Sequence, residues 1–377
     1  MTLVELMVVV TIAVLLIGVS VPMMKPAVDD AKRREASRQF NVFLTSAKAR
    51  AIQNGRPAGV WVERDAAGGN AALNVYMAET PAPYSGDFIS STAVLVDSDS
   101  DGRSESADID PALSLSLPFL VQAGDSIRFG YKGARFELVS VPPIPDLKGV
   151  GVPSVYTIVF EAPSAIVNPG PDGKWGDAGV DDDGQNGTDD RGEAGWALSD
   201  DGPNPPPPGT VVSFQIYRQP RRSKVAPLLF SGGVAIDLEY SGIGASGSQF
   251  DASLQNQPGV LNSQPVIVMF DPGGAVSKVY TGIYNAGTGT IPLVGAPVQG
   301  TIHFLLGKFD QSVPPPVLAT AVSPTLNATQ TNLEDTGNSW VSIADRTGAI
   351  TTAENASGAT LVDAREFVIS GQGSGGI

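Results

Sequence analysis

The sequence predicts an α+β protein in which a long N-terminal helix is followed by a large β-sheet-rich globular head with long loops. Three observations predict this class. Residues 1–54 begin with an apolar stretch and continue with apolar residues at helical spacing. Beyond residue 55, many short segments are rich in β-branched residues. The chain also holds 43 Gly and 30 Pro with only 17% charged residues, which indicates a loop-rich β protein.

The first half of the expected helix, residues 1–26, is almost wholly apolar. Residues 6–24 carry no charge, and a membrane-spanning helix needs about 20 such residues. Glu5 is the exception, and a carboxylate in hydrocarbon costs on the order of 3 kcal/mol unless it has a partner. The amine of Met1 is the nearest cation, but helix geometry directs it away from Glu5 of the same chain. A neighbouring copy could supply that amine, so the sequence predicts self-assembly.

The second half of the helix, residues 27–54, is amphipathic. The apolar stripe consists of Val28, Ala31, Phe40, Phe43, Leu44, Ala47 and Ala51. Asn54-Gly55 is a helix stop signal, and Pro57 follows it. A helix from about Thr2 to Asn54 would be roughly 80 Å long at 1.5 Å per residue. We therefore expect its first half to protrude and its second half to pack under the head.

Residues 55–377 are expected to form the β-rich head, with no second independent domain. The expected strands are 58–64, 73–78, 92–96, 127–131, 135–140, 154–161, 210–218, 234–240, 265–270 and 300–306. Residues 271–274 and 345–348 are expected hairpin turns. Long loops interrupt the strands at 307–339 and at 162–209, the latter an acidic insertion that ends in four prolines.

The N-terminal residues resemble a known family. Thr2-Leu3-Val4-Glu5-Leu6, then an apolar helix and Pro22, resemble the mature N-terminus of type IV pilins and type II secretion pseudopilins. The resemblance implies a leader cleaved before residue 1 by a prepilin peptidase and methylation of the new N-terminus. It also implies that Glu5 pairs with the amine of a neighbouring Met1, and that the helix loosens at Pro22 inside a filament. Met1 departs from the usual Phe of the family.

Several readings remain open. The N-terminal segment could instead be a signal anchor or a signal peptide. However, no basic region precedes the apolar stretch and no small-residue cleavage site follows it. Within the resembling family, the chain is expected to be a structural subunit of a type IV pilus-like filament. A minor pseudopilin of a type II secretion system and a pilin-borne adhesin are the alternatives.

Composition excludes some functions. A net charge of −15 argues against nucleic acid as a partner, because phosphate binding needs basic patches. With no Cys and a single His, the chain has few residues for a transition-metal site or a nucleophile pair. His303 is expected on the polar face of its strand. We therefore expect no enzymatic activity.

Acids at alternate positions followed by Gly suggest a first calcium loop. Alternate spacing lets several carboxylates converge on one hard cation, and Gly permits the sharp turn. The candidate ligands, counted as in a twelve-residue calcium loop, are Asp97, Asp99, Asp101, Arg103 through its carbonyl, Glu105 and Asp108. A solvated acidic turn is the alternative.

A second acidic loop lies inside the insertion at 162–209. Crowded carboxylates repel one another unless a cation neutralises them. The candidate ligands are Asp182, Asp183, Asn186, Thr188, Asp190 and Glu193, with Gly184 a defect at the third place of the count. A flexible acidic loop is the alternative. The expected cofactor is thus calcium at one or two sites, which would tie down the insertion without a disulfide.

The expected partners follow from the resemblance. They are other copies of the chain in a helical filament, the inner membrane before assembly, and the prepilin peptidase and pilus assembly machinery. The expected location is the inner membrane and then the cell surface, or the periplasm for a pseudopilin.

Overall fold

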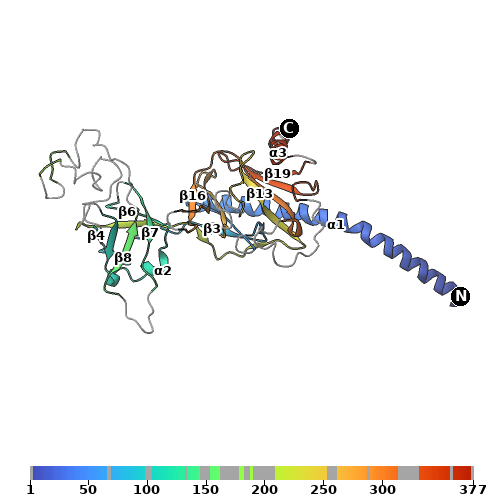
Figure 1. Ribbon diagram of the computed structural model, residues 1–377, viewed down its shortest axis with the longest axis horizontal. Coiled ribbons are helices and arrows are strands. Elements are labelled where there is room, and N and C mark those ends of the chain that lie inside the picture. The colour runs from blue at the N-terminus through green and yellow to red at the C-terminus, as the bar shows by residue number, and fades with distance from the viewer. Residues whose placement is uncertain are drawn as a thin grey trace. The chain divides into compact units, whose positions relative to one another are not determined.

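The computed structural model describes most of the chain. The described residues are 3–65, 69–97, 104–131, 134–144, 153–161, 178–181, 187–189, 209–252, 261–286, 289–312, 331–356 and 360–374. Within the two longer helices, the side chains of residues 3–5, 8–9, 13–27 and 371–374 lie outside the description. The chain divides into two compact units (Figure 1): unit 1 comprises residues 1–79 and 221–377, and unit 2 comprises residues 80–220.

Unit 1 contains two antiparallel sheets. The first has the order β11 (Arg221–Arg222), β3 (Asn74–Glu79), β1 (Ala58–Glu63), β14 (Val266–Phe270), β15 (Val276–Gly282) and β16 (Leu293–Ala296), with β12 (Leu228–Leu229) also paired to β3. The second has the order β19 (Ile350–Glu354), β18 (Ser339–Ile343), β17 (Ile302–Lys308), β13 (Val234–Ile243) and β2 (Ala71–Ala72). Only Leu73 separates β2 from β3, so the chain passes directly from one sheet to the other.

The sheets of unit 1 form a half-barrel around one helix. Helix α1 is assigned to Leu3–Asn54, and its part with continuously described side chains, Val28–Asn54, lies against both sheets. The helix ends where predicted, because Gly55 takes the left-handed backbone (φ +60°) that terminates helices. A second helix, α3 (Leu361–Ser374), covers the outer face of the second sheet. The short η3 (Phe309–Gln311) follows β17.

Unit 2 is built on one seven-stranded antiparallel sheet. Its order is β10 (Phe214–Tyr217), β6 (Ser126–Phe129), β7 (Phe136–Ser140), β8 (Tyr156–Phe160), β5 (Ser106–Ile109), β4 (Ala93–Val96) and β9 (Val211–Val212). The two edge strands β9 and β10 are consecutive in the chain and separated only by Ser213, so the sheet nearly closes into a barrel. Phe129, Phe136 and Phe160 pack together in its core at centroid distances of 5.2–6.0 Å. The short α2 (Leu117–Leu120) and η1 (Pro111–Leu113) lie between β5 and β6.

The predicted fold class is wrong. The described chain is dominated by β-sheets, which form a half-barrel and a nearly closed barrel, and the helix that packs on them is the short stretch of about 27 residues from Val28 to Asn54. An α+β arrangement of a long pilin helix and one globular head does not describe this. The physical reason is that residues 80–220 fold around their own apolar core, separate from the core that surrounds α1.

The individual strands were predicted better than the class. Each of the ten expected segments coincides with a strand to within a few residues, and 210–218 holds both β9 and β10. The hairpin turns at 271–274 and 345–348 connect β14 to β15 and β18 to β19.

Candidate assembly helix and cation loops

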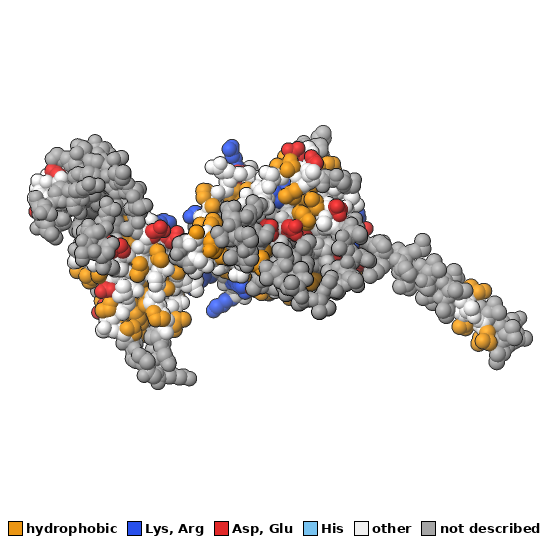
Figure 2. All heavy atoms as spheres, viewed as in Figure 1, with side chains coloured by type: hydrophobic (Ala, Val, Ile, Leu, Met, Phe, Trp, Pro, Cys, Tyr) orange, Lys and Arg blue, Asp and Glu red, His pale blue; other side chains and the backbone are white. Residues whose placement is uncertain are grey.

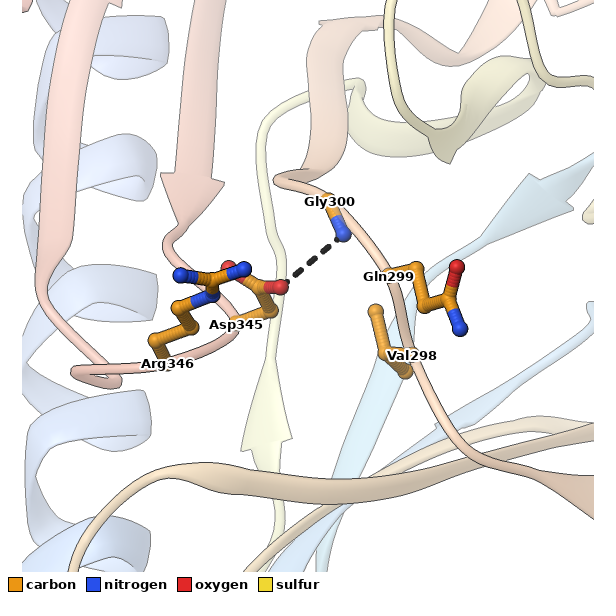
Figure 3. Close-up of a pocket in the computed structure, with 5 residues that line it drawn as sticks. All are labelled: Val298, Gln299, Gly300, Asp345 and Arg346. Atoms are coloured by element: carbon orange, nitrogen blue, oxygen red, sulfur yellow. Dashed lines mark hydrogen bonds between the residues drawn. The ribbon is translucent and has the colours of Figure 1, made fainter.

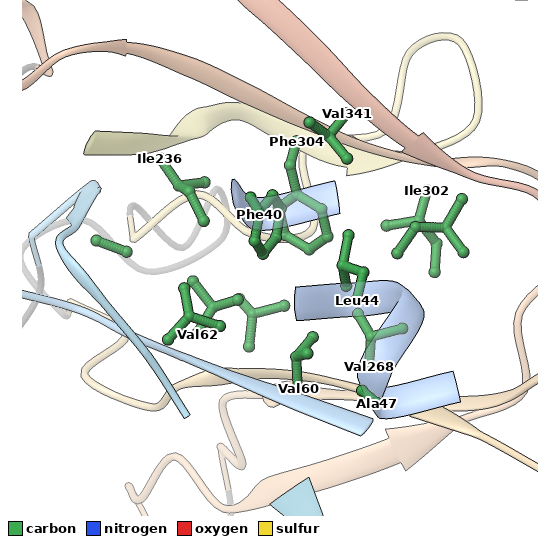
Figure 4. Packing of buried hydrophobic residues seen from close by; sticks show 14 of the residues in the cluster. Phe40, Leu44, Ala47, Val60, Val62, Ile236, Val268, Ile302, Phe304 and Val341 are labelled. Atoms are coloured by element: carbon green, nitrogen blue, oxygen red, sulfur yellow. The ribbon is translucent and has the colours of Figure 1, made fainter. Parts of the chain in front are cut away.

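The C-terminal half of α1 is held by apolar packing. Phe40, Leu44, Ala47 and Ala51 recur every three or four residues and are fully buried. Figure 4 shows Phe40 and Leu44 among side chains from both sheets. Phe40 meets Phe304 of β17 edge to face, with ring centroids 5.5 Å apart. Because both sheets contact this stripe, removing the helix would expose the whole core of unit 1.

A buried arginine fastens the same helix to the segment before β18. The side chain of Arg33 is only 4% exposed, and its guanidinium contacts Asp30, the carbonyl of Gly337 (Nε to O, 3.0 Å) and Asp335 (3.4 Å). At Gly337 a Cβ would press on the guanidinium, so a larger residue there would displace the Arg33 side chain. Lys308 also contacts Asp335 at 2.8 Å. Burial alone would raise the pKa of Asp335, but the Lys308 hydrogen bond, the Gly337 amide and the Arg33 charge together lower it.

The N-terminal half of α1 presents apolar side chains to solvent in the single chain. Leu6, Met7, Val10 and Ile12 are each more than half exposed, and Figure 2 shows hydrophobic side chains standing free near this end of the helix. Glu5 and Pro22 lie within α1, but their side chains, and all of Met1, are outside the described residues. Among the helices searched over the described residues, none is long and apolar enough to cross a membrane.

The first acidic loop connects β4 to β5. Asp97 and Glu105 flank it, while Asp99, Asp101 and Arg103 lie outside the described residues. Val96 pairs with Ser106, so Asp97 and Glu105 lie at the same end of this hairpin. Asp108 pairs with Val94 instead, about 10 Å further along the strands, and accepts a hydrogen bond from the Thr157 hydroxyl (2.6 Å). The structure therefore brings Asp97 and Glu105 together but not Asp108.

The second acidic loop is described only at its edges. Asp182, Asp183, Asn186, Asp190 and Glu193 lie outside the described residues, and Thr188 is exposed. Asp189 accepts a hydrogen bond from the Gly179 amide (2.7 Å), which brings residues 178–181 and 187–189 together. Nowhere in the described chain are three His, Asp or Glu side chains grouped to hold a metal ion.

The outer face of the second sheet carries a buried polar layer that the sequence did not predict. His303 was expected on a polar, open face, but it is fully buried beneath α3, so that expectation is wrong. Its Nδ1 lies 2.8 Å from the Ser342 hydroxyl, and burial, followed by the charge of Arg365, lowers its pKa to about 4. Arg365 of α3 donates to the carbonyls of Tyr240, Gly244 and Gly247 (2.6–2.8 Å). The contacts hold α3 on the sheet, and His303 and Ser342 are both buried.

Two carboxyl groups in this layer have raised pKa values. Asp237 is fully buried, and burial raises its pKa to about 6 despite a 2.7 Å hydrogen bond from Asn332. Burial, with the charges of Asp237 and Asp251, raises the pKa of Glu239 to about 7. No signal in the sequence identifies this layer, because the residues that cover it, Asn332 and α3, are distant in the chain.

An open pocket of about 740 Å³ lies between the loop before β17 and the turn after β18. Val298, Gln299, Gly300, Asp345 and Arg346 line it (Figure 3). The Asp345 carboxylate accepts a hydrogen bond from the Gly300 amide (3.0 Å), and that bond is the main reason why the pKa of Asp345 is lowered. The Asp345 carboxylate thus holds the backbone at Gly300, and the residues that line the pocket offer no acid–base pair for catalysis.

No known family model, no curated protein and no solved structure matches this chain.

Proposed function

We propose that this chain is a structural subunit of a type IV pilus-like filament, assembled by packing of the N-terminal halves of α1. The observation that carries the proposal is the exposure of Leu6, Met7, Val10 and Ile12 on a helix whose other half is buried. Burying such a side chain completely is worth roughly 1.5–3 kcal/mol. Four of them per chain are a substantial driving force for association or membrane insertion.

The distribution of these side chains favours a helix surrounded on all sides. Met7 and Val10, three residues apart, share one side of the helix, Ile12 lies on roughly the opposite side, and the flanking sequence is apolar as well. A helix that is apolar all round is buried in a large assembly or a membrane. This supports a filament core made of several such helices, entered from the inner membrane.

Glu5 supplies the register in this proposal. Its carboxylate would pair with the Met1 amine of a neighbouring subunit, since a lone charge in an apolar core is strongly disfavoured. Copies of the chain displaced along the filament axis would then be fixed at one spacing. The anchoring of α1 by its apolar stripe and by Arg33 would transmit the position of the helix to unit 1.

The remaining expectations belong to the same proposal. A prepilin peptidase would process the chain, and pilus assembly machinery would move it from the inner membrane to the cell surface. Calcium would hold one or both acidic loops, with Asp97 and Glu105 as the pair already placed together. The role is structural, without catalysis.

A pilin-borne adhesin is the second candidate, favoured by one observation. Unit 2 has its own core and is inserted between β3 and β11 of unit 1, as a binding module carried on a filament subunit would be.

The test is electron cryomicroscopy of filaments sheared from the cells that make this chain, comparing wild type with Glu5→Leu and Glu35→Gln. Glu35 is an exposed acid on the same helix and serves as the control. We expect a core of N-terminal helices with Glu5 beside a neighbour's Met1, no filaments for Glu5→Leu, and normal filaments for Glu35→Gln. Filaments that lack this chain, or that persist in Glu5→Leu, would exclude the proposed role.

A further inference from the structure

Three neighbouring strands of unit 2 place two arginines on the outer face of its barrel. Strands β10, β6 and β7 are adjacent (β6 and β7 are labelled in Figure 1). Ile127, Phe129 and Phe136 point into the core, so Arg128 points outward. Ser126 pairs with Glu137 and Ile127 with Phe136. Arg135, which is exposed, immediately precedes β7.

Two uncharged polar side chains of β10 join the arginines. Gln215 pairs with Arg128, and Tyr217 with Ser126. The guanidinium carbon of Arg135 lies 3.5 Å from the centroid of the Tyr217 ring, and the Tyr217 hydroxyl donates to Gln215 Oε1 at 2.6 Å. Stacking on an aromatic ring fixes the plane of a guanidinium and leaves its N–H groups free to donate.

The arginines lack an anionic partner in the described structure. Neither forms an ion pair with a described carboxylate, and Arg128 Nε is buried without a hydrogen-bond acceptor. Leaving a buried donor such as Arg128 Nε unpaired is destabilising. Glu137 does not compensate them: its pKa is raised, first by burial and then by Glu161, whereas a paired arginine would lower it.

We propose that Arg128, Arg135, Gln215 and Tyr217 bind an oxyanion group, a carboxylate or a sulfate, presented by an acidic polysaccharide. A guanidinium group offers parallel N–H donors that match two oxygens of such a group. The Gln215 amide and the Tyr217 hydroxyl add neutral hydrogen-bonding groups beside the charge, as sugar hydroxyls require.

A sugar polymer fits better than nucleic acid. Nucleic-acid binding depends on many phosphate contacts along a basic surface, and this chain has a net charge of −15. A local pair of cations with neutral polar neighbours suits single anionic groups spaced along a hydroxyl-rich chain. The inference is independent of how the subunits assemble.

The experiment measures binding of the full chain, in neutral detergent, to immobilised polygalacturonate, dextran sulfate and neutral dextran. The first two polymers distinguish carboxylate from sulfate. Arg135→Gln is the main variant, because Arg135 is exposed and its loss leaves the core intact. Arg128→Gln is interpreted only if its thermal unfolding matches wild type. Arg346→Gln, an exposed arginine of unit 1, is the matched control.

We expect wild type to bind at least one acidic polymer and not neutral dextran. Arg135→Gln should weaken binding at least tenfold, Arg135→Lys should restore it only in part, and Arg346→Gln should stay within twofold of wild type. Absence of binding to both acidic polymers, equal binding to neutral dextran, or equal losses in Arg135→Gln and Arg346→Gln would each overturn the proposal.

Discussion

Phe40 of α1 and Phe304 of β17 meet edge to face, and this contact joins the helix to the second sheet of unit 1. Both rings are fully buried, and Phe304 also stacks on Phe250 at 5.5 Å. The helix is therefore an integral layer of unit 1, because its side chains complete the core of the half-barrel.

Replacing Phe40 with Ala should lower the free energy of unfolding of unit 1 by about 3–5 kcal/mol, the usual cost of truncating a buried aromatic ring. Denaturant titration followed by circular dichroism measures this. Val42→Ala is the control, since Val42 is 63% exposed on the same helix and its loss should change stability by less than about 0.5 kcal/mol. Equal effects of the two substitutions would show that α1 does not complete the core.

Replacing Arg33 with Met should cost about 2–3 kcal/mol, because it removes one of the two cations that contact the mostly buried Asp335, the other being Lys308, and the hydrogen bond to the Gly337 carbonyl. The neighbouring Arg34→Met tests the alternative that any arginine on α1 matters. The pair between Arg34 and Glu354 is more than two-thirds exposed on both sides, so its loss should cost less than about 1 kcal/mol. If Arg33→Met lowers the free energy of unfolding no more than Arg34→Met does, Arg33 does not fasten α1 to the segment before β18.

His303 by itself should lower the stability of unit 1 as the pH falls from about 6.5 to 4, because this residue must stay neutral in the folded state. Its pKa is lowered from 6.5 to about 4, so the unfolded chain takes up the proton first. The penalty begins below about pH 6.5, is complete below about pH 4, and amounts to about 3 kcal/mol at 1.36 kcal/mol per pH unit. Ser342, Trp340 and Arg365 face the imidazole and offer it no carboxylate.

Asp237 and Glu239 act in the opposite direction: their raised pKa values give a penalty that grows as the pH rises above about 4 and is complete only above about pH 6 and 7, respectively. The pH profile of wild type therefore combines opposing contributions, and the measurement is the difference in unfolding free energy between His303→Gln and wild type at each pH. That difference should shift in favour of the variant by about 3 kcal/mol between pH 6.5 and pH 4, because only the contribution of His303 is removed. A difference that does not change with pH would refute the assignment to this residue.

Removing unit 2 should leave unit 1 folded. Arg221 pairs with Glu79, so the ends of unit 1 at the insertion are already adjacent. A chain in which a short Gly-Ser linker replaces residues 80–220 should keep its cooperative thermal unfolding. Deleting residues 58–79 instead removes β1 and β3 from the core and should abolish that unfolding transition. Loss of cooperative unfolding in the first deletion would mean that unit 1 depends on unit 2.

Calcium should raise the thermal unfolding temperature of the chain if either acidic loop binds it, since a ligand that binds only the folded state stabilises it. Asp99→Asn with Asp101→Asn tests the first loop, and Asp182→Asn with Asp183→Asn tests the second. Asp310→Asn, an exposed acid in η3, is the control. Magnesium is the comparison ion. If calcium leaves the unfolding temperature unchanged, neither acidic loop is a calcium site.

Period-two alternation and Gly or Pro boundaries were sufficient to locate most strands, and helical spacing located the buried stripe of α1. Other elements lacked such a signal. Strands β2, β11 and β12 have two residues each, too few for any period. Helix α3 contains Gly371 and Gly373, and its buried side includes Arg365, so it does not read as an amphipathic helix.

The fold class could not be predicted because alternation reveals strands but not their partners. β1 pairs with β14, about 200 residues later, across the whole of unit 2. The contacts on which the two proposals rest also join residues far apart in the chain: Arg33 meets Asp335, and Arg135 stacks on Tyr217. Glu5 and the acidic loops could be proposed from the sequence because their signal is local, and their roles stay predictions.

The insertion point of unit 2 has a mechanical consequence. When a chain is pulled from its ends, tension reaches residues 80–220 only after β11 separates from β3. The amide of Ser223, which donates to the Met77 carbonyl at 2.8 Å, and the pairs of Arg221 and Arg222 with Glu79 and Ala78 bridge that junction. While these bonds hold, force bypasses the inserted barrel, so its outer face keeps its shape under load.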